Sequence, residues 1–130
     1  MEMREILFRG KCRKSGKWIY GNLLKHEEGD YSIYEEGKAY SIPVREETIG
    51  QYIGLKDCNG NRIFEGDIIK VSRKSKCGFG DIYGLAVVEW DSKQKAFTLI
   101  PSDDYFEEVR LVAVVNNKYK NPGLYKEVIE

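Results

Sequence analysis

The chain has 130 residues, of which 42% are hydrophobic and 32% charged, and its 21 basic and 21 acidic side chains give a net charge of zero. This length fits one domain with a modest core, because single domains commonly contain about 100–150 residues. No apolar run approaches the roughly 20 residues of a membrane helix, and the N-terminal residues do not have the basic and hydrophobic regions of a secretion signal. We therefore expect a cytoplasmic protein.

The N-terminal third predicts two β-hairpins, because β-prone runs flank short turns that contain glycine. The strands are expected at residues 6–9, 18–23, 31–34 and 39–42, with turns at 14–17 and 35–38. Pro43 cannot donate to a β-ladder, so we expect it to end its strand or to lie on an edge. A short helical turn is predicted within residues 46–50.

The segment 48–71 has the densest turn chemistry of the chain. Asn59-Gly60 is the strongest short hairpin signal in a sequence, because both residue types tolerate positive φ. A second tight turn, Gly66-Asp67, leads directly into an apolar run. Both turns are predicted to be structural.

Asp57 begins a run that resembles a calcium loop. The EF-hand pattern requires Gly at its sixth position and Glu at its twelfth, where this chain has Arg62 and Ile68. The calcium hypothesis therefore fails. We predict instead that the Asp57 carboxylate forms an Asx-turn with backbone N–H groups ahead of Asn59-Gly60.

The C-terminal half predicts further strands around one long loop. The polar, basic and glycine-rich segment 72–81 is predicted to be a mobile loop. The most apolar strand, residues 83–90, is expected to be central. Further strands are expected at 96–100 and 111–115, a turn at 91–95, and one helical turn after residue 121.

About nine short strands at 8–12-residue spacing predict an all-β fold. The five strands from residue 50 onward match the number in a small Src-homology-3-like barrel. We therefore expect N-terminal hairpins packed on such a barrel, with at most short helical turns. In this layout a single domain comprises a hairpin region (1–47), a barrel core (48–120) and a tail (121–130).

Charge is segregated along the chain although it sums to zero. Residues 1–25 and 51–80 carry net charges of +5 and +3, whereas residues 26–50 and 81–130 carry −5 and −3. Two interpretations stay open. The blocks form opposed patches for a partner or for a second copy, or neighbouring strands of opposite charge pair across the sheet.

Residues suited to catalysis or metal binding do not form a pattern. Cys12, Cys58 and Cys77 are far apart, His26 lies in a loop-like acidic run, and zinc sites need closely spaced ligand pairs. Five acids near predicted turns are the only group with a chance to converge, although their spacing does not require it: Asp57, Glu65, Asp67, Glu89 and Asp91. We expect no enzyme activity, no cofactor and no metal.

Basic residues beside aromatic ones suggest a single-stranded nucleic-acid site, since bases stack on aromatic side chains beside a positive groove. The candidates near Trp18 and Tyr20 are Arg9, Lys11, Arg13, Lys14 and Lys17. Those near Phe79 are Lys70, Arg73, Lys74 and Lys76. A sequence pI near 6.6 argues against a dedicated nucleic-acid domain.

Protein binding agrees better with the composition. Nine Tyr and two Trp exceed what a core of this size needs, and such residues are favoured at interfaces. Strand edges can also pair with another chain.

Several motifs resemble the YopX family, small proteins of phages and prophages. The resemblance rests on Phe8-Arg9-Gly10-Lys11, Trp18 to Leu23, Gly50 to Asp57, Asn59-Gly60, Ile63 to Ile68, Val87 to Trp90, and the tail residues Asn117, Tyr119 and Asn121-Pro122. One departure is Asn116, where the family usually has Gly after its last strand. The resemblance implies a β-rich fold with a small-barrel core and no established activity, cofactor or catalytic residue.

These observations lead to one functional hypothesis and one alternative. The first is a non-enzymatic phage or prophage accessory protein, in the bacterial host cytoplasm, that binds a protein partner or itself. The alternative is a small barrel that binds single-stranded nucleic acid. The sequence does not identify the partner or the oligomeric state.

Overall fold

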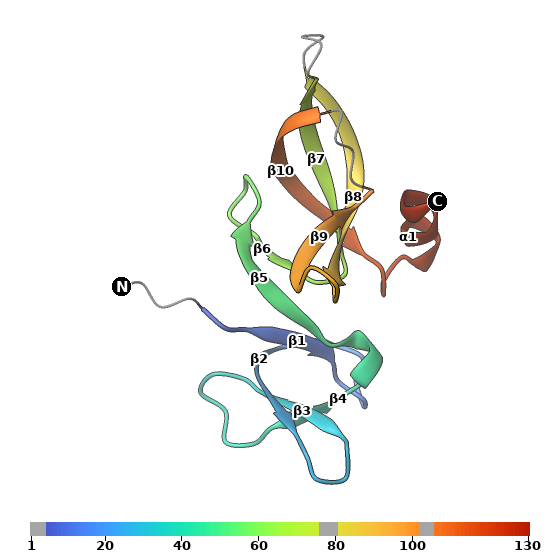
Figure 1. Ribbon diagram of the computed structural model, residues 1–130. Helices are drawn as coiled ribbons and strands as arrows, with labels where there is room; N and C mark the ends of the chain where they lie inside the picture. Colours follow the sequence, from blue (N-terminus) through green and yellow to red (C-terminus); the bar gives the residue numbers. More distant parts are fainter. Residues whose placement is uncertain (1–4, 76–80, 102–105) are drawn as a thin grey trace. The chain divides into compact units, whose positions relative to one another are not determined.

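The computed structural model describes residues 5–75, 81–101 and 106–130 (Figure 1). Over these residues the chain is mostly β, with one short helix, which confirms the predicted all-β class. The elements are β1 (Phe8–Lys11), β2 (Trp18–Lys25), β3 (Tyr31–Tyr34), β4 (Ile42–Val44), the 3-10 turn η1 (Glu46–Thr48), β5 (Gly50–Lys56), β6 (Arg62–Phe64), β7 (Asp67–Ser75), β8 (Asp81–Asp91), β9 (Ala96–Ile100), β10 (Phe106–Asn117) and α1 (Pro122–Ile129).

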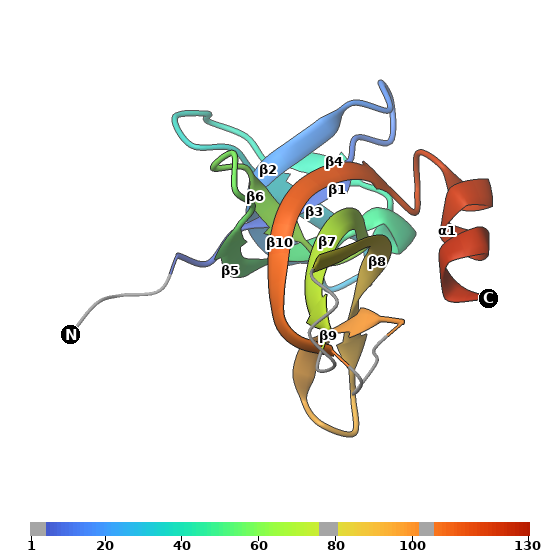
Figure 2. The same ribbon diagram turned by 90° about the horizontal axis from the view of Figure 1, so that it is seen from above.

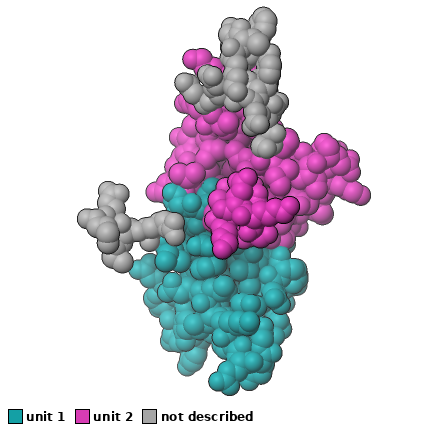
Figure 3. All heavy atoms as spheres, viewed as in Figure 1, with its two compact units in different colours: residues 1–54 teal, residues 55–130 magenta. Residues whose placement is uncertain are grey.

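The chain divides into two compact units, residues 1–54 and 55–130, coloured separately in Figure 3. The division falls within β5. The sequence-based layout of one domain, with a hairpin region, a barrel core and a tail, stays a prediction.

The first unit contains the antiparallel strands β4-β3-β2-β1-β5, in this order, of a six-stranded sheet whose order ends with β6. Its first hairpin pairs Phe8 with Gly21 through Lys11 with Trp18, so the first strand begins two residues later than predicted. The second hairpin is also present, but β4 covers 42–44 rather than 39–42.

Pro43 lies in β4, the last strand of the sheet order, opposite Ser32 of β3. Pro43 therefore lies within the terminal strand of the sheet order rather than at the end of its strand. The predicted helical turn after it is η1.

The outer side of β4 meets the chain that follows β1. An isolated antiparallel bridge joins Cys12 to Val44. The amide of Arg13 donates to the Pro43 carbonyl at 3.1 Å, and that of Arg45 donates to the Lys11 carbonyl at 2.9 Å. Both sides of β4 are therefore hydrogen-bonded within the unit.

The second unit contains an antiparallel sheet with the strand order β10-β7-β8-β9. Neighbouring residues of a strand face opposite sides of the sheet, yet Ile68 and Ile69 are both fully buried, as are Ala86 and Val87. Both faces of the inner strands β7 and β8 are therefore covered. The prediction that the strand from Tyr83 to Trp90 is central is confirmed.

The bounds of one predicted loop and of the last predicted strand need correction in this unit. Residues 72–75 belong to β7 and pair with β8 and β10, so the predicted loop is shorter; the rest of it, residues 76–80, lies outside the described residues. The last strand is β10, which is longer than the predicted 111–115 and contains three register shifts. Its strong curvature is visible in Figure 2.

The closed five-stranded barrel is not confirmed, because within the described residues no ladder joins β9 to β10. The tail forms an eight-residue α-helix, α1, rather than one turn. Asn121 caps this helix by accepting a hydrogen bond from the Leu124 amide at 3.0 Å, and proline follows the cap. Proline is favoured there because its ring presets φ and its missing N–H costs nothing.

Candidate functional site

The Asp57 carboxylate organises the turn between β5 and β6. Its Oδ1 accepts the amides of Asn59 and Asn61, both at 2.9 Å, and its Oδ2 accepts the Val114 amide at 3.0 Å. Burial alone would raise the pKa of Asp57, but these bonds, together with the Asn61 side-chain amide, hold it below its usual value. The predicted Asx-turn is confirmed, and it also ties the turn to β10.

The two glycine turns are structural, as predicted. Gly60 and Gly66 have φ of 83° and 91°, a region that residues with a Cβ rarely adopt. The Gly66 amide donates to the Val88 carbonyl at 2.8 Å. Asp67 is 1% exposed and accepts the Phe64 amide at 2.8 Å, so this carboxylate stabilises the turn before β7.

The remaining candidate acids serve separate purposes. Asp91 Oδ1 accepts the amides of Lys93 and Gln94 in the β8–β9 turn, at 2.9 and 3.2 Å. Glu89 faces the C-terminal segment, with Oε2 at 3.5 Å from Lys118 Nζ. Within the described residues no group of three or more His, Cys, Asp or Glu side chains is placed to hold a metal ion. Asp57, Asp67 and Asp91 therefore act in turns, and Glu89 contacts Lys118.

The basic residues of the first unit are only partly available to a ligand. Arg9 is 5% exposed, and its guanidinium lies 4.8 Å from the Trp18 ring centroid. Because it is buried, Arg9 is not among the predicted basic residues that a nucleic acid could contact at the surface. Lys11 lies 5.6 Å from the same ring, while Lys14 and Lys17 are exposed.

The described basic residues that were predicted to bind nucleic acid in the second unit lie on β7. Lys70 and Lys74 are exposed, and Lys70 Nζ lies 5.0 Å from the ring centroid of Tyr83. Arg73 donates to the Pro101 carbonyl at 2.8 Å. Lys76 lies outside the described residues.

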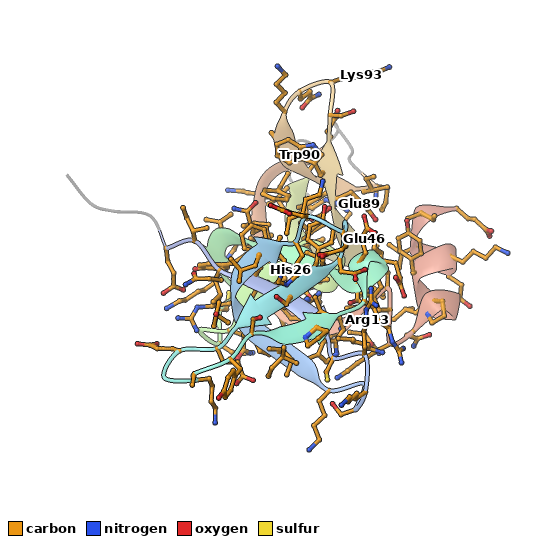
Figure 4. All side chains as sticks on the ribbon, turned by 90° about the horizontal axis from the view of Figure 1, so that it is seen from below. Arg13, His26, Glu46, Glu89, Trp90 and Lys93 are labelled. Carbon is orange, nitrogen blue, oxygen red and sulfur yellow. The ribbon has the colours of Figure 1, made fainter. Side chains whose placement is uncertain are left out.

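A pocket of about 510 Å³ lies in the first unit, where the turn between β1 and β2 and the turn between β2 and β3 approach the start of β4. Its lining residues are Cys12, Arg13, Lys14, His26, Glu28, Asp30, Tyr31, Ser41, Ile42 and Pro43. Arg13 and His26 are labelled in Figure 4. Arg13 pairs with Asp30 at 3.3 Å, and His26 Nε2 lies 2.7 Å from Ser32 Oγ.

The Cys12 thiol belongs to the wall of this pocket. A hydrogen bond from the Ser15 hydroxyl, bonds from the backbone of Ser15 and Lys14, and the Lys14 charge together hold the pKa of Cys12 below its usual value. The Arg13–Asp30 ion pair also joins the first positive block of the sequence to the first negative block. At this point the charge blocks pair with each other.

The two edge strands of the second sheet differ. On β10, the carbonyls of Leu111 and Val112 accept the Cys58 amide at 3.1 and 3.2 Å, and the Val114 amide donates to Asp57. This chain therefore covers part of the β10 edge with its own turn.

At the other edge, β9 pairs only with β8 in the part of the chain that the structure describes. Its sequence, Ala-Phe-Thr-Leu-Ile, contains no charge and no proline. Trp90 of β8 meets Phe97 edge-to-face, with ring centroids 5.1 Å apart. Trp90 nevertheless stays 48% exposed and Ile100 38% exposed; Trp90 and the turn residue Lys93 are labelled in Figure 4. The result is an open apolar edge.

Sequence reasoning identified β9 as a strand but not as this edge. The signal was an uncharged five-residue run between Lys95 and Pro101, in a chain where about one residue in three is charged. Strand order decides which strand lies at an edge, and the sequence does not state strand order.

The family model described as YopX protein matches residues 5–126. The chain belongs to the YopX family. The match covers both units of this YopX-family chain, and no curated protein matches it. Among the described residues, no helix has the length and the apolar character that a membrane span requires.

Proposed function

We propose that this YopX-family chain is a non-enzymatic phage or prophage accessory protein that binds a protein partner through β9. The open, uncharged edge of β9 in the described chain is the single observation that carries the proposal. An extended segment of a partner adds to such an edge through main-chain hydrogen bonds, and alternate side chains provide specificity.

The protection of two other edge strands, β4 and β10, supports this choice. Native proteins cover, bend or charge exposed strand edges to prevent unwanted pairing. Here β4 contains a proline and is bonded on both sides, and β10 has three register shifts and a turn along it. An edge without such protection is suited to a partner strand.

The test compares three full-length baits in host cells: the wild type, Thr98→Lys, and Val115→Lys as the matched control. Thr98 is the middle residue of β9, whereas Val115 is 46% exposed on β10 at the opposite edge. A partner is expected with the wild type and the control and is expected to be lost with Thr98→Lys, because a charge on an edge strand opposes pairing.

The purified partner is then added to the wild type, and hydrogen exchange is measured. Slower exchange of the β9 amides is expected. Equal capture by all three baits, or protection confined to other strands, would refute the proposal.

Single-stranded nucleic-acid binding is the second candidate, favoured by the exposed Lys70 beside Tyr83. A fluorescent 12-nucleotide oligomer is titrated at 20 and 200 mM salt. If this candidate holds, affinity falls steeply with salt because counterions are released, and Lys70→Ala weakens binding. No binding at 20 mM salt eliminates it.

A further inference from the structure

We infer that the partner strand is β9 of a second copy of this chain, so that two copies pair antiparallel about a twofold axis at Thr98. This inference rests on the proposed function and names the partner. The pairing would join two four-stranded sheets into one continuous sheet of eight strands, β10-β7-β8-β9 followed by the same strands in reverse order.

The ends of β9 fix the register. Lys95 has φ of 54°, which is outside the extended region, and Pro101 has no N–H to donate. Antiparallel pairing about Thr98 uses all five residues between these two limits. Pairing about Phe97 or Leu99 brings Lys95 or Pro101 into the ladder, so the register about Thr98 is preferred.

In this register the apolar side chains meet one another. Phe97 lies opposite Leu99 of the partner subunit, and Ala96 lies opposite Ile100 of the partner subunit. Within one copy Phe97 is already opposite Trp90, and Leu99 is opposite Val88. An apolar strip therefore continues from Trp90 across the axis, and apolar cross-strand pairs contribute about 0.2–1 kcal/mol each.

The charges of the hairpin do not oppose the pairing. β9 has no charged residue, and the lysines of its turn, Lys93 and Lys95, lie at one end of the strand. In an antiparallel pair the two Lys95 residues are separated by about six residues of strand, or about 20 Å. That separation exceeds the Debye length of about 8–10 Å at physiological salt.

The size of the contact predicts its strength. One five-residue ladder with its flanking side chains is smaller than a standard interface, and small interfaces are weak or transient. The dissociation constant is expected at about 10–1000 µM, so the dimer depends on concentration.

Sedimentation of the full chain tests the pairing. Thr98→Lys places two lysines opposite each other at the axis, and Thr98→Glu places two glutamates there. Each variant alone is expected to be monomeric, with a dissociation constant at least tenfold weaker than that of the wild type, because like charges directly opposite destabilise a strand pair. An equimolar mixture of the two is expected to regain dimer, since lysine then faces glutamate.

A second pair of variants keeps the test valid if substitutions at Thr98 unfold the chain. Ala96 and Ile100 are exposed and lie opposite each other across the axis. The A96K/I100E variant is expected to dimerise, whereas A96K/I100K is expected to be monomeric. Val115→Lys is the control and should dimerise like the wild type.

Three results overturn the inference. They are a wild type that stays monomeric at 1 mM, a mixture of the Thr98 variants with no more dimer than either alone, and equal dimerisation of the two double variants. Failure of this inference can be distinguished from failure of the proposed function. A monomeric wild type whose β9 amides are protected by another captured protein contradicts the inference but leaves protein binding at β9 standing.

Discussion

The two units handle their sheet edges in different ways. In the first unit the last strand of the order, β4, receives hydrogen bonds from the chain around Cys12, so its own unit occupies both sides. In the second unit, β9 has one neighbour within the described residues. This difference separates an edge that is part of the fold from an edge that is available to another chain, although both strands are short and apolar.

The two tryptophans allow each unit to be followed separately. Trp18 lies in the first unit and Trp90 in the second, and the sequence contains no other tryptophan. Variants with Trp18→Phe or Trp90→Phe therefore report on one unit at a time. Coincident urea transitions would indicate one cooperative domain, as the sequence layout predicts.

The largest expected effect is that of Gly21→Ala in the first unit. A Cβ at Gly21 would overlap the Tyr34 carbonyl oxygen, so the backbone would have to move. We expect a loss of about 3 kcal/mol or more in the free energy of unfolding, seen first in the Trp18 transition. Gly16→Ala is the control for strain without a clash, because φ is positive at Gly16, unlike at Gly21, and no atom lies within 4 Å of a Cβ placed there. Equal losses would show that Gly21 is not closely packed.

Asp57→Asn is expected to destabilise the second unit by about 1–3 kcal/mol, because buried N–H groups lose a charged acceptor. Since the pKa of Asp57 is lowered in the folded state, its contribution is complete above the unfolded value near 3.8 and is lost as pH falls through the folded value. Urea unfolding is measured from pH 2.5 to 7. The free energy of unfolding should fall less in acid for the variant than for the wild type. Parallel pH profiles would contradict this role.

Gly66→Ala and Gly60→Ala separate backbone strain from packing in the second unit. Both glycines have positive φ, which costs a residue with a Cβ about 1–2 kcal/mol, but a Cβ at Gly66 also meets Tyr119 Cε2 at 3.1 Å, whereas Gly60 has open space. Thermal melting should show the larger loss for Gly66→Ala. The reverse order would mean that Tyr119 moves aside freely.

The smallest effect concerns the pocket of the first unit. Because hydrogen bonds from Ser15 and Lys14 lower the pKa of Cys12, its alkylation by iodoacetamide should reach half its maximal rate below pH 9.0, the ordinary value. Ser15→Ala should slow alkylation at pH 7 by about two- to fivefold. Peptide mass mapping measures the rates, with the exposed Cys58 as an internal reference for the reagent. An unchanged rate would exclude the Ser15 hydroxyl as the cause.

Local chemistry predicted the turns well and the sheet arrangement less well. Asp57, Gly60 and Gly66 were predictable because a turn is determined by neighbours in sequence. The extent of β7 was not, because Ser72 to Ser75 are polar and basic and are held by ladders to β8 and β10. The β9 edge was not predictable for the same reason, since edges arise from pairing between distant strands.

The helix α1 packs against β8, and its Tyr125 hydrogen-bonds Glu89 of that strand, which has a consequence at the alkaline end of the pH range. Burial, the charge of Glu89 and a hydrogen bond to it raise the pKa of Tyr125 above its ordinary value of 10.0. Its contribution to stability is therefore complete below pH 10 and disappears as pH rises through the folded value. Phenolate formation would place a second negative charge beside Glu89, so base weakens the attachment of the C-terminal helix, whereas acid weakens the Asp57 turn.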